Sequence, residues 1–276
     1  MIEKKSQSKI SFNFWFAVSL AVITSGALLF GLIILFQANL SLNKKIAEAK
    51  EAERPADIDI VILQESSCRD CASLNSLINA IKKENVKVNS EKTVEIASPE
   101  GKELIGKYSI AKAPALIVSG EIEKDANLKA IWPQLGEIKD GVFILRQVGA
   151  PYVLINSGEV RGRIKFVMLT DAGCGECYKV AQHEQILKQL GLPTQDQQII
   201  DRQSAAGQKL ITEYKIKLLP TIILTGDLEV YPPLIKVWPQ VGTVEKDGAY
   251  VFREGVKQMG VYKDLTANQV IKPAAD

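Results

Sequence analysis

Two cysteine pairs with identical spacing are the residues of this chain best suited to covalent chemistry: Cys68 with Cys71, and Cys174 with Cys177. Thiol–disulfide exchange needs one thiolate to attack a disulfide and a second thiol close enough to resolve the mixed disulfide. Two intervening residues at the start of a helix suit this chemistry, because a helix N-terminus favours a thiolate on the first cysteine. The spacing therefore predicts Cys68 and Cys174 as nucleophiles, with Cys71 and Cys177 as resolving thiols.

The two pairs belong to an internal duplication of the sequence. An offset of 106 residues carries Cys68 onto Cys174 and aligns glycines, tyrosines, prolines and a Trp-Pro-Gln segment in the two copies. The aligned pairs include Gly101 with Gly207, Tyr108 with Tyr214, Pro114 with Pro220, Gly120 with Gly226, and Trp132 with Trp238. Because the copies differ freely elsewhere, the shared positions indicate what each unit depends on. We expect two similar domains, residues 56–150 and 151–265.

Each copy has the same expected order of elements around its cysteines. An apolar strand leads to the CxxC, an amphipathic helix leads out of it, and a second strand and a second helix follow. A proline then stands at the start of a third apolar strand, where its missing N–H is tolerated. The repeated tyrosines are expected to pack in the cores. The repeated tryptophans are expected to pack against the sheets, with a peptide-contact surface as the alternative. The expected first and third strands are 58–63 and 115–118 in one copy, and 164–169 and 221–224 in the other.

This order of elements resembles the thioredoxin superfamily, and the resemblance covers both copies. It implies an α/β fold of two tandem domains, each with a central mixed sheet flanked by helices. It also implies a cis peptide bond before Pro114 and Pro220, with both prolines against the cysteines and in contact with substrate. The tandem arrangement is similar to protein disulfide isomerases and archaeal protein disulfide oxidoreductases. The family's buried carboxylate, six positions before the first cysteine, is replaced by Ile62 and Met168, so proton transfer must use another group or water.

Four carboxylates flank the cysteines and are expected to tune their pKa values. Asp70 and Glu176 directly precede the resolving cysteines, while Glu65 and Asp171 lie three residues before the nucleophiles. A negative charge within about 4–6 Å disfavours a thiolate, so these acids would make the sites weaker oxidants. Arg69 is expected to offset Asp70, so the two sites need not share a potential. The alternative is that all four acids are solvated loop residues.

The single histidine and the possibility of a metal site receive little support from the sequence. His183 has Leu77 as its counterpart at the 106 offset, so the duplication assigns it no role and a surface position on a helix is expected. Two CxxC pairs can bind zinc or copper, but zinc ribbons place their pairs about 15–20 residues apart. Here the second pair begins more than a hundred residues after the first pair ends. We expect neither a metal nor a cofactor.

An uncharged N-terminal stretch, residues 14–36, is long enough to form a transmembrane helix. A bilayer core requires about 20 apolar residues at helical rise. A cleaved signal peptide is the alternative, but its apolar part normally has about 7–15 residues. The prediction is an N-terminal tail at residues 1–13, the transmembrane helix, and a helical stalk at residues 37–55.

The order of these segments predicts the location and the partners. With all the globular mass behind a short tail, we expect a single-pass protein of the cell membrane whose domains lie outside the cytoplasm, where disulfides persist. The lipid bilayer would contact residues 14–36, and small residues in that span make a homodimer possible. The net charge is +2 with no block of like charge, so nucleic acid is not an implied partner. Residues 266–276 are expected to form a C-terminal tail.

Together these features predict a membrane-anchored thiol–disulfide oxidoreductase of the reductase or isomerase type. Its substrates would be cysteine-containing exported proteins, and an unidentified redox partner would recharge it. A second hypothesis is a thioredoxin-like binding or scaffold protein whose disulfides are inert, because a fold alone does not determine chemistry.

Overall fold

The structure is a computed structural model that describes residues 7–194 and 196–273, apart from the side chains of residues 7–14, 24 and 27–29. Residues 1–6 of the expected N-terminal tail and 274–276 of the expected C-terminal tail lie outside the described residues. The chain divides into two compact units, Met1–Pro55 and Ala56–Asp276, which are described separately.

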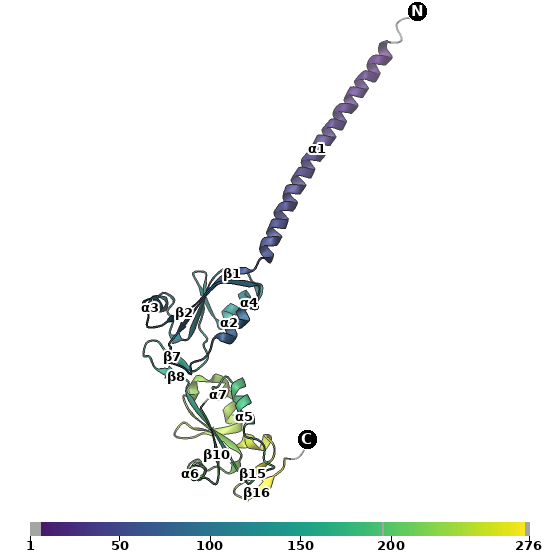
Figure 1. The fold of residues 1–276 in the computed structure, drawn as a ribbon. Coiled ribbons are helices and arrows are strands. Elements are labelled where there is room, and N and C mark those ends of the chain that lie inside the picture. The colour runs from purple at the N-terminus through teal and green to yellow at the C-terminus, as the bar shows by residue number, and fades with distance from the viewer. Residues whose placement is uncertain (1–6, 195, 274–276) are drawn as a thin grey trace, which may run out of the picture. The chain divides into compact units, whose positions relative to one another are not determined.

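The first unit is one continuous helix, α1 (Gln7–Glu53) (Figure 1). It contains both the apolar stretch 14–36 and most of the expected stalk, and no proline or capping glycine separates the two. Among the described residues, no helix is long and apolar enough to cross a membrane. Residues 14–36 are helical as expected, and a membrane-spanning role for them stays a prediction from the sequence.

The second unit contains two copies of one arrangement of strands and helices, in the order that the duplication predicts. The elements of the first copy are β1 (Ala56–Gln64), α2 (Asn75–Ile81), β2 (Val86–Glu95), α3 (Pro99–Tyr108), β3 (Lys112–Ala113), β4 (Ala115–Gly120), α4 (Ala126–Leu135), β5 (Gly136–Lys139), β6 (Val142–Leu145), β7 (Tyr152–Leu154) and β8 (Val160–Arg161). The elements of the second copy are β9 (Ile164–Thr170), α5 (Gln182–Gln189), β10 (Gln197–Asp201), α6 (Ala205–Glu213), β11 (Leu218–Leu219), β12 (Thr221–Gly226), η1 (Leu228–Val230), α7 (Pro232–Val241), β13 (Gly242–Val244), β14 (Tyr250–Phe252), η2 (Glu254–Gln258), β15 (Tyr262–Asp264) and β16 (Gln269–Ile271).

Each copy has its own five-stranded mixed sheet. The strand orders are β2-β1-β4-β6-β5 and β10-β9-β12-β14-β13, which are the same order in the two copies. The first strand of each copy pairs in parallel with the second strand and antiparallel with the strand after the proline. The expected α/β class with two mixed sheets is confirmed.

Helices cover both faces of each sheet (Figure 1). In the first copy, α2 and α4 pack on one face through Ile78 and Trp132, and α3 packs on the other face, where Tyr108 is buried. The second copy repeats this arrangement, with Trp238 of α7 on one face and Tyr214, at the end of α6, on the other. The repeated aromatic residues are core residues, as the sequence predicts.

The glycines shared at the start of α3 and α6 have a common steric cause. A Cβ on Gly101 would lie 2.1 Å from the carbonyl oxygen of Glu95, and a Cβ on Gly207 would lie 2.2 Å from that of Asp201. Each helix therefore approaches the end of the preceding strand too closely for any side chain. The duplication preserves this contact, which fixes the helix against the sheet that holds the cysteine loop.

A β-hairpin that the sequence analysis does not predict follows each five-stranded sheet. We call these the closing hairpins, β7–β8 in the first copy and β15–β16 in the second. They pair with β3 and β11, the short strands before the two prolines, to form three-stranded sheets. The first closing hairpin lies within the expected range 151–265, and the second extends into the expected tail 266–276.

Candidate functional site

Both cysteine pairs form disulfide bonds. The Sγ–Sγ distances are 2.05 Å for Cys68–Cys71 and 2.01 Å for Cys174–Cys177, and the Cα–Cα distance is 5.4 Å in each pair. The described residues contain no free cysteine. The two pairs are thus placed for the reversible dithiol–disulfide chemistry that their spacing suggests.

The cysteines lie in turns and not at the start of a helix, so the expected helix N-terminus is wrong. Helix α2 begins at Asn75, four residues after Cys71, and α5 begins at Gln182, five residues after Cys177. The helices start late because of the residue that follows each resolving cysteine. The backbone N–H of that residue donates to a distant segment of the chain and not to a carbonyl group of a helical turn. A helix dipole is therefore not the source of thiolate stabilisation at these sites.

The closing hairpins provide those distant acceptors. The N–H of Ala72 donates to the carbonyl oxygen of Pro151 at 2.7 Å, and the N–H of Tyr178 donates to that of Val261 at 2.8 Å. Because Pro151 and Val261 directly precede β7 and β15, each closing hairpin begins beside a cysteine pair. The hairpin is thus a structural neighbour of the disulfide in both copies.

The same hairpins run along the strands before the two prolines. The peptide bonds before Pro114 and Pro220 are cis. Residue Ala113, directly before Pro114, pairs with Val153 of β7, while the residue before Pro220 pairs with Lys263 of β15. In the first copy, Val153 clusters with Cys68, and Pro114 lines the same cavity as both cysteines. In the second copy, Lys263 takes the place of Val153 beside the residue before the cis-proline.

The first site has an apolar interior. Cys68 is 8% exposed and clusters with Ala113 and Val153, while Cys71 and Ile96 pack against this cluster. A cavity of about 420 Å³ opens here and is lined by residues that include both cysteines and Pro114. A thiolate on Cys68 would thus have limited access to solvent, because burial in apolar surroundings disfavours the charged form.

Asp70, between the first two cysteines, is paired with a distant arginine and not with its neighbour Arg69. The guanidinium of Arg163 donates from Nε to Oδ2 at 2.7 Å and from Nη2 to Oδ1 at 2.8 Å. These hydrogen bonds hold the pKa of Asp70 below its usual value. The Sγ of Cys68 lies 3.7 Å from Oδ1, so Asp70 contacts the predicted nucleophile, but Arg163 matches its charge.

Glu65 and Glu176 have local roles at the loop surface. The carboxylate of Glu65 accepts from the backbone N–H of Ser67, two residues later, at 3.2 Å. Glu176 forms an ion pair with Lys272 at 2.5 Å, and this contact lowers the pKa of Glu176. Both side chains of that pair are two-thirds exposed, so solvent weakens their influence on the cysteines.

Asp171 differs from the other three acids because its side chain is fully buried. Its Oδ2 lies 2.7 Å from Nε of Arg202, outside hydrogen-bond angles, and 3.4 Å from Nζ of Lys263. Its Oδ1 accepts the N–H of Gly173 at 2.9 Å, and its carbonyl oxygen accepts the N–H of Cys174 at 2.9 Å. A buried carboxylate with two cations thus lies directly beneath the second cysteine loop.

His183 is buried, so the expected surface position is wrong. Its Nε2 lies 3.1 Å from the hydroxyl oxygen of Tyr178, and that hydroxyl donates to the carbonyl oxygen of Pro220 at 2.7 Å. Since the tyrosine has one proton, Nε2 of His183 must be the protonated nitrogen that donates to it. Burial lowers the pKa of His183 to about 4 and raises that of Tyr178, so both are neutral near pH 7.

Sequence reasoning missed the partner residues Arg163, Arg202, Lys263 and Tyr178. It gave weight to residues that the two copies share. Arg202, Lys263 and Tyr178 are not shared, because their counterparts in the first copy are Ile96, Val153 and Ala72. A second internal offset, of 110 residues, carries Tyr152 onto Tyr262 and Val160 onto Val270. This second offset could have indicated the closing hairpins from the sequence.

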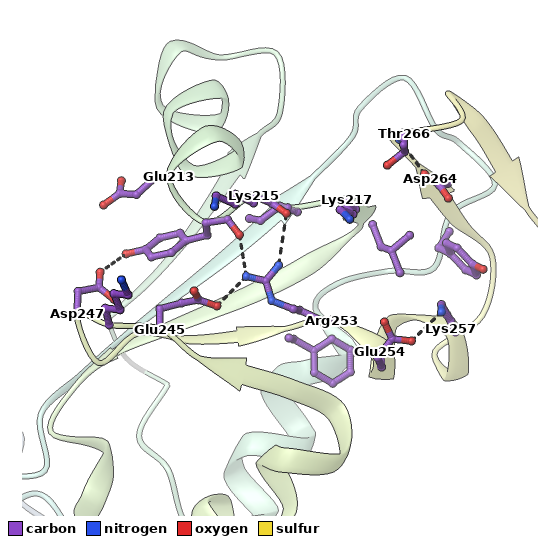
Figure 2. A pocket seen from close by; sticks show the side chains of 16 residues that line it. Glu213, Lys215, Lys217, Glu245, Asp247, Arg253, Glu254, Lys257, Asp264 and Thr266 are labelled. Carbon is purple, nitrogen blue, oxygen red and sulfur yellow. Dashed lines mark hydrogen bonds and ion pairs between the residues drawn. The ribbon is translucent and has the colours of Figure 1, made fainter.

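A second cavity lies in the second copy, away from the cysteines. It has a volume of about 820 Å³, and no CxxC residue lines it. Figure 2 shows Arg253 at its centre, with hydrogen bonds to the carboxylate of Glu245 and to backbone oxygens at the end of α6. These oxygens belong to Tyr214, at 2.7 Å, and to Lys215, at 3.5 Å.

The first copy has the same arginine contact. Arg146 donates to the carbonyl oxygens of Tyr108 and Ser109, at 2.6 and 3.1 Å, and pairs with Glu137. Because both copies use this arginine to bind the free carbonyl groups at a helix C-terminus, its role is structural. Arg253 is therefore no indication of a ligand in the cavity of Figure 2.

In comparisons with known proteins, no family model and no curated protein sequence matches this chain. Within residues 7–194 and 196–273, no group of three or more His, Cys, Asp or Glu residues is placed to hold a metal ion. Two disulfide-bonded CxxC pairs and two mixed α/β sheets covered by helices fit thioredoxin-like domains, and the cysteine pairs suggest thiol chemistry.

Proposed function

We propose that this protein is a thiol–disulfide oxidoreductase of the reductase or isomerase type, with one active site in each copy. The observation that carries the proposal is the recurrence of one constellation: a disulfide-bonded CxxC, a cis-proline and a closing hairpin, which meet in the same way at both sites. The copies have diverged at many other positions. The retention of this setting in both copies supports a shared chemistry at the two sites.

The proposed reaction exchanges two electrons and two protons between a protein dithiol and a disulfide. In the reductive direction, the thiolate of Cys68 or Cys174 attacks a substrate disulfide, and the released substrate sulfur takes up a proton. A bond between enzyme and substrate sulfur atoms forms as the substrate S–S bond breaks. The thiolate of Cys71 or Cys177 then attacks the enzyme sulfur, releasing the second substrate thiol and restoring the disulfide.

The proposed substrates are cysteine-containing proteins, and a separate redox partner must return the enzyme to its starting state. The cavity beside Cys68 and Cys71 supports the entry of a substrate segment at the first site. The location outside the cytoplasm and the contact with a lipid bilayer stay predictions from the sequence, which no finding tests.

A binding or scaffold protein with inert disulfides is the second candidate. One observation favours it: Cys68 is only 8% exposed, and the residue after Cys71 is hydrogen-bonded to the segment that leads into the closing hairpin. On this hypothesis the disulfides brace the contact between the hairpin and the sheet. The two candidates differ in whether the cysteines react with protein substrates at all.

Reduction of insulin by dithiothreitol, followed with the full-length protein, tests the proposed function. We expect the unmodified protein to accelerate the reaction, and Cys68→Ser and Cys174→Ser each to remove part of the acceleration. The combined substitution should remove it entirely. Circular dichroism of each variant checks that the fold is retained.

Substitution of a serine beside the first cysteine, Ser67→Ala, is the matched control, since it alters the same turn without removing a thiol. It should retain the activity of the unmodified protein. If the combined cysteine variant is as active as the unmodified protein, the oxidoreductase proposal is wrong, and the scaffold hypothesis takes its place.

A further inference from the structure

The second cysteine site has two cationic side chains at positions where the first site has apolar ones. Asp171 is the counterpart of Glu65 at the 106 offset, Arg202 is the counterpart of Ile96, and Lys263 is the counterpart of Val153 at the 110 offset. These three residues of the second copy form one ionic cluster.

The backbone confirms that the counterparts occupy equivalent places. The N–H of Arg202 donates to the carbonyl oxygen of Thr170 at 2.8 Å, as the N–H of Ile96 donates to that of Gln64 at 2.9 Å. Each of these bonds joins the residue after the second strand to the end of the first strand. Arg202 therefore starts from the same point beside its cysteine loop as Ile96 does.

Lys263 and Val153 are equivalent in the same sense. Val153 pairs with the residue before Pro114 and belongs to the apolar cluster that contains Cys68. Lys263 pairs with the residue before Pro220. The second copy thus places an ammonium-bearing side chain at the position from which the first copy covers its nucleophile with a valine.

The cluster in the second copy carries an excess of one positive charge. Asp171 supplies one negative charge with a side chain that is 0% exposed, whereas Arg202 and Lys263 supply two positive charges from side chains that are 24% and 15% exposed. Asp201 adds a carboxylate at the second loop, where it accepts the N–H of Ala172, but the first copy has an equivalent acid, Glu95, which accepts the N–H of Ser66. Glu176 is two-thirds exposed and paired with Lys272, and burial keeps Tyr178 and His183 neutral near pH 7. Arg202 and Lys263 are thus two cations without counterparts at the first site.

We propose that Arg202 and Lys263, whose charges exceed that of the buried Asp171 between them, stabilise the Cys174 thiolate of the reduced second site and make Cys174–Cys177 the more oxidising of the two disulfides. The inference rests on the proposed function. A nearby cation favours a thiolate, whereas an apolar surrounding without a cation disfavours one. Stabilising the reduced form of a cysteine pair raises its reduction potential.

The two sites then favour opposite directions of electron transfer with protein substrates. The second disulfide is the better acceptor of electrons from protein dithiols, and the first dithiol is the better donor to protein disulfides. When a small dithiol reduces the second site, one S–S bond breaks in the protein and one forms in the reductant. Two electrons pass to the protein, and stabilisation of the Cys174 thiolate releases one of the two protons to solvent.

Equilibration of the full-length protein with buffers of reduced and oxidised dithiothreitol tests this difference. Acid quenching, alkylation and mass spectrometry of the peptides report the reduced fraction of each cysteine pair separately. We expect the equilibrium constant for reduction to be at least about tenfold larger at the second site, which corresponds to about 30 mV for a two-electron couple.

Substitutions with opposite expected signs separate an electrostatic effect from structural damage. Lys263→Met should lower the equilibrium constant of the second site by about tenfold, Lys263→Arg should retain it, and Asp171→Asn should raise it, because a negative charge is lost. The reciprocal change Val153→Lys should raise the constant of the first site.

Lys272→Gln is the control, since it removes a lysine that is two-thirds exposed from the same loop region and should change the constant by less than about twofold. Equal constants for the two sites of the unmodified protein would overturn the inference while leaving the proposed function intact. So would shifts of the same sign for Lys263→Met and Asp171→Asn. If neither site responds to the buffers, the proposed function itself fails, and the inference fails with it.

Discussion

Arg163 and Asp70 form a bidentate ion pair at the first cysteine site, with N–O distances of 2.7 and 2.8 Å. Asp70 lies between the two cysteines, and Arg163 directly precedes β9, 93 residues later in the chain. The pair keeps Asp70 ionised by lowering its pKa, and it also matches the charge that Asp70 presents to Cys68. The sequence predicts that Asp70 opposes a thiolate on Cys68. Arg163, which lies outside the cysteine loop, partly neutralises that charge.

Arg163→Gln should expose Cys68 to the full negative charge of Asp70. We expect the midpoint of the pH dependence of Cys68 alkylation in the reduced protein to rise by about 0.5–1 pH unit, since one unit corresponds to 1.36 kcal/mol. Asp70→Asn should move the midpoint in the opposite direction. Both side chains are about half exposed, so the free energy of unfolding should change by less than about 1 kcal/mol.

Lys165→Gln is the control for the Arg163 substitution, because it removes a positive charge from an exposed position two residues further along. Its alkylation midpoint should match that of the unmodified protein. Equal midpoints for Arg163→Gln and Lys165→Gln would show that the ion pair does not influence Cys68.

The resolving cysteines should be separable from the nucleophiles by trapping. Cys71→Ser and Cys177→Ser leave the attacking thiolate without a partner to release the substrate, so mixed disulfides with protein substrates should accumulate. Cys68→Ser and Cys174→Ser should not accumulate them. Non-reducing electrophoresis after incubation with a disulfide-containing protein measures the difference, and trapping by Cys68→Ser equal to that by Cys71→Ser would reverse the assignment at the first site.

His183 should make stability depend on pH between its two pKa values. Burial lowers its pKa from 6.5 to about 4 in the folded protein, so the unfolded state binds the proton first as the pH falls. The stabilising contribution is complete above pH 6.5 and is lost as the pH falls towards 4, by up to about 3 kcal/mol. Urea unfolding at a series of pH values measures this loss.

His183→Leu supplies the residue that the first copy has at the equivalent position, Leu77, and so forms a matched variant. It removes the titrating group while keeping an apolar side chain in the site. The decline in stability between pH 6.5 and 4 should be smaller in this variant than in the unmodified protein. An unchanged decline would mean that other groups cause it.

Arg253→Ala should destabilise the second copy by about 1–3 kcal/mol, because the carboxylate and carbonyl groups around Arg253 lose a charged hydrogen-bond donor. Arg146→Ala should have a similar effect on the first copy. Urea unfolding measures the loss, and the substitutions should leave the alkylation of all four cysteines in the reduced protein unchanged. A change confined to cysteine reactivity, with stability retained, would contradict the structural role.

The sequence predicts well those features of the fold that depend on repeated apolar patterns. The strands before the cysteines and after the prolines, and the burial of Trp132 and Trp238, follow from alternation and from the shared register of the two copies. The loop after each CxxC could not be predicted in this way. There the N–H groups of Ala72 and Tyr178 bind carbonyl groups far along the chain, and such tertiary hydrogen bonds override the local helical pattern.

The candidate site was predictable in its sulfur chemistry but not in its electrostatics. The spacing of the cysteines indicates their pairing, whereas the partners of Asp70 and Asp171 lie far along the chain, beside strands or in a closing hairpin. His183 is buried beside the hydroxyl of Tyr178, a contact that no periodic pattern reveals. Comparison of the two copies therefore identified what they share and overlooked the positions at which their sites differ.

The reduction potentials of the two cysteine pairs test the central claim most directly. Equilibration of the full-length protein with glutathione buffers, with each pair quantified by mass spectrometry, gives both values. An exchange-competent pair has a potential above about −300 mV, and structural disulfides lie below that value. We predict that both Cys68–Cys71 and Cys174–Cys177 lie above it. If both disulfides stay oxidised in buffers poised at about −300 mV, they are structural, and the protein is not a thiol–disulfide oxidoreductase.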